Sequence, residues 1–209
     1  MKRIEKKSKS KKREEVNKID FFKENYSKSW KYIKQSKKFI WAITFIFFLS
    51  AFIGFVFQPS EVVNLILEYI QEILTKTETM SSSEMIFFIF FNNLRIAFMG
   101  IIYGFALGIF PVLSTFINGY VVGYVSSSAV SSSGIFSLLS LLPHGIFELP
   151  AIFISFGLGL KFGTFLFYKE KMKKFSEFFT NSLRVFVFVI IPLLAVAAII
   201  EGCLIFLFK

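Results

Sequence analysis

The 209-residue chain contains one histidine, His144, and one cysteine, Cys203. A single cysteine excludes a disulfide within the chain, and a single histidine excludes the H-E-x-x-H pair by which a zinc protease holds its metal. The sequence also lacks the G-x-S-x-G nucleophile elbow. We therefore expect a protein that is not an enzyme, with no catalytic residues, metal site or cofactor, and an intramembrane hydrolase is the reading that these absences disfavour.

Apolar residues dominate what remains. Hydrophobic side chains occupy 55% of the positions, phenylalanine alone occupies 31, and the mean hydropathy is +0.64. A soluble domain of this size cannot bury so much apolar surface. The composition predicts an all-α, polytopic bundle of membrane helices.

Uncharged apolar stretches long enough to cross roughly 30 Å of hydrocarbon locate about five transmembrane helices. We predict spans at about 39–57, 85–110, 111–127, 135–167 and 183–208, which form a transmembrane domain over residues 39–209. Only Pro111 marks the boundary between the second and third spans. The fourth span is too long for one straight helix, so we expect it to be kinked or broken at Pro143 and Pro150.

Charged residues outside the spans predict the orientation. The tail, residues 1–38, carries 15 Lys/Arg against 5 Asp/Glu, and the segment 168–182 is also basic. The loop 58–84 is acidic, and the serine-rich loop 126–134 is neutral. Because basic loops stay on the cytoplasmic side, we predict a multi-pass cell-membrane protein with a cytoplasmic N-terminus and an external C-terminus.

Three segments outside the spans show the periodicity of amphipathic helices. The tail repeats apolar residues every three or four positions, which favours contact with the anionic inner leaflet of the lipid bilayer over nucleic acid. These residues are Ile19, Phe22, Tyr26, Trp30 and Ile33. The helix expected at 60–76 lies outside, where it covers the bundle, lies on the membrane or docks a protein partner. A short third stripe lies in "MKKFSEFF", within the cytoplasmic segment.

Glycines repeat at four-residue spacing in the second and third spans. They are Gly100, Gly104, Gly108, Gly119 and Gly123. Small residues one turn apart allow two helix backbones to approach closely within a membrane. The pattern predicts a compact bundle and is also compatible with a homo-oligomer.

Polar side chains within the spans form a second candidate site. They are Asn92, Asn93, Arg95, Asn118, His144, Glu148 and Glu201. Each needs a partner or a water-filled cavity in lipid, and similar depth makes Arg95 and Glu148 the most economical ion pair. One interpretation is that this cluster pins the helices of a scaffold together. The alternative is a small-solute or ion transporter or channel that uses Arg95, His144 and Glu148 beside a proline-broken helix.

The strings "NN" at 92–93, "GFALGIFP" at 104–111, "NGYVVG" at 118–123 and "LLPHGIFELPAIFIS" at 141–155 together resemble the stage II sporulation protein M family. The resemblance covers about residues 40–207. It implies a five-span septal membrane protein that anchors peptidoglycan-degrading enzymes during engulfment in spore-forming bacteria. By resemblance, the signature positions are Asn93, Asn118, Gly119, Pro143, His144, Gly145, Glu148 and Pro150.

Overall fold

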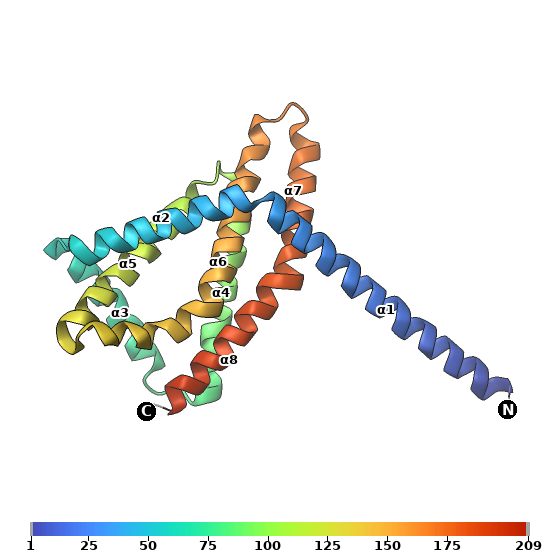
Figure 1. The fold of residues 1–209 in the computed structure, drawn as a ribbon, viewed down its shortest axis with the longest axis horizontal. Coiled ribbons are helices and arrows are strands. Elements are labelled where there is room, and N and C mark those ends of the chain that lie inside the picture. The colour runs from blue at the N-terminus through green and yellow to red at the C-terminus, as the bar shows by residue number, and fades with distance from the viewer. Residues whose placement is uncertain (1, 208–209) are drawn as a thin grey trace.

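Helices make up almost the whole of the computed structural model (Figure 1). It describes the backbone of residues 2–207 and the side chains of residues 19–81, 83–138 and 145–201. The α-helices are α1 (Lys2–Gln35), α2 (Lys37–Val56), α3 (Ser60–Thr77), α4 (Ser82–Ile102), α5 (Ile109–Ser133), α6 (Leu142–Gly163), α7 (Lys171–Val185) and α8 (Ile191–Leu207). No strand occurs within residues 2–207, which confirms the predicted all-α class.

Five helical segments of the described chain are long and apolar enough to cross a membrane. They are Lys37–Val56, Ser83–Phe105, Ile109–Ser133, Gly145–Phe167 and Lys171–Glu201. At 1.5 Å per residue each reaches roughly the 30 Å of a hydrocarbon core. The prediction of a five-span bundle is confirmed.

The break between the second and third spans lies earlier than predicted. A 3-10 turn, Tyr103–Phe105, follows α4, and the chain reverses through Leu107 and Gly108, whose φ angles are 58° and 71°. Glycine suits this left-handed conformation, which carries no steric cost without a Cβ. Pro111 lies within the first turn of α5, where its missing N–H has no intrahelical partner to lose.

The predicted serine-rich loop 126–134 is wrong, because α5 continues through these residues to Ser133. The hydroxyl of Ser132 donates to the carbonyl of Ser128 one turn back, so serine is accommodated within the helix. Gly134 ends α5 with a φ of 78°. A run of serine between apolar residues is therefore compatible with a longer third span.

The fourth and fifth spans differ in how they accommodate proline. A 3-10 segment, Ile135–Leu141, precedes α6. Helix α6 continues through Pro150 and bends, as Figure 1 shows. The fourth span is therefore kinked rather than broken. The helix that contains the fifth span begins at Lys171, earlier than residue 183, so it includes the stripe of Met172, Phe175 and Phe179 that we predict on the cytoplasmic side. Its π-helical turn, Phe186–Ile190, lies just before Pro192. A wide turn there relieves the clash between the proline ring and the preceding carbonyls.

The helices pack in two groups that share α6. Helices α4, α6 and α8 contact one another, and α2 lies along α5 and against α6 (Figure 1). The first group contains the main hydrophobic core, which includes the fully buried residues Ile101, Leu158 and Ile190. The C-terminal part of α1 contacts α7, and the rest of α1 extends away from the other helices.

Glycines lie at the crossings of both groups. A Cβ on Gly104 would lie 2.6 Å from the Cα of Gly159 in α6, and one on Gly100 would overlap the Phe156 ring. Such distances leave no room for a side chain, because carbon atoms pack at about 3.5–4.0 Å. Gly108 likewise faces Leu160 of α6, and Gly119 and Gly123 face the backbone of α2. All five predicted packing glycines therefore contact other helices of the same chain.

Candidate functional site

A cavity of about 1010 Å³ lies between the end of α2, α3, α4 and α5. Most of its lining is apolar, with Ile66 of α3, Ile96 and Met99 of α4 and Ile117 of α5 among the contributors. Its residues with polar groups are Asn92, Arg95, Ser114, Asn118 and the tyrosines Tyr69, Tyr103 and Tyr120. The cavity thus combines a long apolar surface with a small polar region that carries one positive charge.

Helical spacing explains how α4 and α5 contribute to this cavity. Asn92, Arg95, Ile96 and Met99 recur at three- and four-residue intervals, so they share one face of α4. Ser114 and Asn118 are one turn apart on α5, and the Asn118 amide donates to the Ser114 carbonyl at 2.8 Å. The glycines that contact α6 or α2 lie on another face of each helix, which leaves these residues directed to the cavity.

Tyr120 lines the cavity where α5 meets the end of α2. Its hydroxyl donates to the carbonyl of Phe57 at 2.6 Å and so joins α5 to the end of α2. Pro59 follows as the residue before α3, and α3 then lies along the cavity with Ile66 buried against it. This arrangement places the amphipathic helix predicted at 60–76 as a wall of the cavity.

The seven polar residues predicted as one cluster lie in different places. Asn92, Arg95 and Asn118 line the cavity together, whereas Asn93 is buried on another face of α4. Glu148 and Glu201 are half-buried, take part in other interactions and are not among the lining residues. The side chains of His144 and Pro143 lie outside the described residues.

The expected ion pair between Arg95 and Glu148 is not among the ion pairs of the described side chains. The geometry of α4 explains the separation. Ala97 faces α6, where its carbonyl accepts a 2.5 Å hydrogen bond from Ser155, and Arg95 lies two residues away on nearly the opposite side. In the same part of the chain, no group of three or more His, Cys, Asp or Glu side chains could hold a metal ion.

A second polar site, which sequence reasoning missed, lies where α1 meets α2. Lys161 of α6 is 9% exposed, and its ammonium donates to the Ser36 hydroxyl at 3.0 Å. The same nitrogen lies 3.8 Å from the centre of the Tyr32 ring, within the range of a cation–π interaction. A lysine inside "GLGLKFG" was the available signal, because a charge within an apolar span needs a partner.

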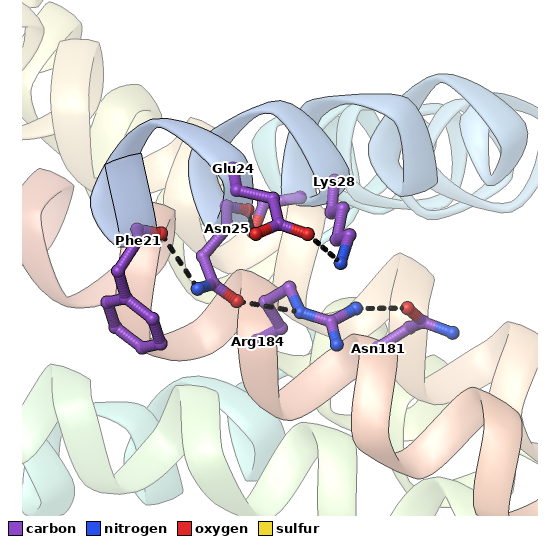
Figure 2. A network of polar contacts seen from close by, with 7 residues as sticks. Phe21, Glu24, Asn25, Lys28, Asn181 and Arg184 are labelled. Atoms are coloured by element: carbon purple, nitrogen blue, oxygen red, sulfur yellow. Dashed lines mark hydrogen bonds and ion pairs between the residues drawn. The ribbon is translucent and has the colours of Figure 1, made fainter. Parts of the chain in front are cut away.

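Helix α1 is joined to α7 by a further set of polar contacts (Figure 2). The Arg184 Nε donates to the Asn25 Oδ1 at 3.1 Å, and its Nη1 donates to Asn181 at 2.6 Å. The Asn25 amide also donates to the Phe21 carbonyl at 2.9 Å, which fixes its orientation. Burial between these helices raises the pKa of Tyr32, so its phenol stays neutral.

Five apolar spans joined by buried polar contacts define a multi-pass membrane protein surrounded by lipid. The chain belongs to the family described as Stage II sporulation protein M, whose model matches residues 43–204. Over 128 residues it is 32% identical to the uncharacterized protein MJ0706 of Methanocaldococcus jannaschii, a match that covers 55% of this chain. The matched region spans 53% of that relative, about half of its length. No solved structure matches the chain.

Proposed function

We propose that this protein is a non-catalytic scaffold or anchor that holds an envelope-associated complex at the cell membrane. The proposal rests on α3, a helix outside the membrane spans that has two apolar faces. One face, with Ile66, is buried in the protein. The other presents Leu67 and Leu74, which are 47% and 61% exposed between polar residues. A helix that keeps apolar side chains exposed beside polar ones has the character of an interaction surface.

The proposed orientation places α3 outside and α1 inside the cell. Basic residues are concentrated in the tail and in the segment 168–182, and such segments remain cytoplasmic. On α1, Ile19, Phe22 and Trp30 are about half exposed, between 47% and 60%. A basic helix with uncovered aromatic side chains binds an anionic inner leaflet through both charge and apolar contact.

Buried polar side chains support a structural role over transport. Ser155 bonds to α4, Lys161 bonds to Ser36, and Arg184 bonds to α1, so each connects separate helices. The transporter alternative requires Arg95, His144 and Glu148 in one site. The lining of the cavity contains Arg95 and does not contain Glu148.

Cross-linking in native membranes followed by purification in mild detergent tests the scaffold role. We expect a stoichiometric protein partner that is lost when Leu67 and Leu74 are both changed to Glu, because the charges disrupt an apolar contact. Asn64→Glu adds a charge to the same helix without removing an apolar side chain, and it should retain the partner. Recovery of the chain alone as a homo-oligomer would contradict the scaffold and favour the transporter.

A further inference from the structure

The cavity between α3, α4 and α5 has properties that the scaffold role does not require. Its volume, about 1010 Å³, is at the upper end of the range for small-molecule sites, roughly 300–1,000 Å³. Such sites have mostly apolar walls and a few polar groups that fix the orientation of the ligand. The walls here come from four segments of the fold, so the cavity is a product of the tertiary structure rather than a groove on one helix.

Arg95 gives this cavity a positive charge. Among the described side chains Arg95 forms no ion pair, and the other polar residues of the lining are amides and hydroxyls, which carry no charge. Arginine remains protonated in proteins. An ionised residue within a membrane span is costly, on the order of 2.5–3.5 kcal/mol on insertion scales, and is therefore a candidate functional residue. An anion in the cavity would remove this cost.

The polar groups are arranged to bind an anion from two helices. Asn92 lies one turn before Arg95 on the same face of α4, and Asn118 lies on α5. The Asn118 amide nitrogen already donates to Ser114. Asn92 and Arg95 can donate to a ligand, as can the hydroxyls of Tyr69, Tyr103 and Ser114 in the lining. A guanidinium donates two parallel hydrogen bonds to phosphate or carboxylate, and the neighbouring amide adds a further donor.

We propose that this cavity binds one anionic phospholipid, with its phosphate at Arg95 and Asn92 and one acyl chain along Ile66, Ile96, Met99 and Ile117. A lipid fits better than a soluble anion because most of the lining is apolar and α4 and α5 are membrane spans. The ligand supplies the negative charge that the lining lacks. It also covers apolar side chains that α3 leaves exposed, such as Leu65 at 66%. The proposal does not depend on a protein partner.

Native mass spectrometry of the whole protein in a neutral detergent tests this site. The probes are phosphatidylglycerol and phosphatidylcholine with identical acyl chains, added at increasing concentration. We expect the wild-type protein to retain one phosphatidylglycerol with saturation and to retain phosphatidylcholine much more weakly. Arg95→Gln should weaken retention roughly tenfold to a hundredfold, because a hydrogen bond to a charged group is lost. Met99→Trp, which adds bulk to the apolar wall of the cavity and keeps the charge, should weaken retention more moderately.

Two matched variants control for charge and bulk elsewhere. Lys28→Gln removes one positive charge from the exposed surface of α1, and Gln71→Trp adds an indole to α3 at an exposed residue outside the lining of the cavity. Both should retain the lipid as the wild-type protein does. Arg95→Lys keeps the charge without the two parallel donors, so it should bind with intermediate affinity and serves if Arg95→Gln does not fold.

Three results would overturn the proposal. The first is equal retention of the two lipids, or retention unchanged by both Arg95→Gln and Met99→Trp. The second is the absence of any retained lipid on the wild-type protein, which would indicate a cavity filled by water. The third is a dimer that needs Arg95 and carries no lipid, which would assign the cavity to a second copy of the chain.

Discussion

Gly104, in the turn that follows α4 and crosses α6, is the most informative position for mutation. In Gly104→Ala the new Cβ would lie 2.6 Å from both the Cα and the carbonyl carbon of Gly159. Backbone atoms cannot rotate away, so α4 and α6 must separate by about 1 Å to restore an ordinary carbon–carbon distance. Overpacking of this kind costs about 1–3 kcal/mol. Lengthening of the nearby Ser155–Ala97 hydrogen bond adds about 1 kcal/mol.

Reversible unfolding in mixed micelles, followed by helical circular dichroism as sodium dodecyl sulfate is titrated, measures the free energy of unfolding. We expect a loss of about 2–4 kcal/mol for Gly104→Ala. Gly145→Ala is the matched control in α6, because among the described side chains its Cβ would meet only that of Leu149, at 3.2 Å. That variant should change stability by less than about 0.5 kcal/mol. If Gly104→Ala is as stable as the wild-type protein, or if both variants lose the same free energy of unfolding, the packing of α4 on α6 is refuted.

Three further predictions concern orientation, the charged residues and the α1–α2 junction. With Cys203 replaced by Ser, a cysteine at Thr79 should react with an impermeant maleimide added outside the cell, and one at Ser10 should not; the reverse pattern contradicts the orientation. In thermal melts, the losses of stability caused by Arg95→Gln and Glu148→Gln should add in the double mutant. A coupling energy above about 1 kcal/mol between the two substitutions would mean that the residues are in contact. Ser36→Ala should lower the stability by about 1–3 kcal/mol, because it removes a hydrogen-bond partner of buried Lys161. Lys161→Met should lower the stability less, because the Ser36 hydroxyl still donates to the Tyr32 carbonyl. Equal losses at Ser36 and Lys161 in the same melts would contradict that asymmetry.

The number and approximate position of the spans could be predicted because length and hydropathy determine them directly. The boundaries at Pro111 and in 126–134 could not, since proline is tolerated in the first turn of a helix and serine can bond to its own helix. The start of the helix that contains the fifth span was missed for a related reason. Lysines at 171–174 exclude the segment from a hydropathy window, yet the helix continues through them.

The candidate site was only partly predictable. Sequence spacing places Arg95 with Asn92 on one face of α4, because one turn separates them. It does not say which neighbouring helix that face meets, and similar depth in the membrane therefore gave the wrong expectation for Glu148. The glycines were more informative, because close backbone approach is a requirement that few other residues satisfy. They show that α4 packs on α6 with the side opposite Arg95.

The attachment of α1 has a mechanical consequence. At 1.5 Å per residue this 34-residue helix is about 50 Å long. The side-chain contacts described for it, to α7, the π-helical turn and Lys161, lie between Phe21 and Ser36. The part before Phe21, about 30 Å long, projects from this attachment, and a rotation of about 5° there moves its far end by roughly 2.5 Å. A force applied to the tail reaches α6 and α7 first, through Lys161 and Arg184, rather than the cavity beside α3.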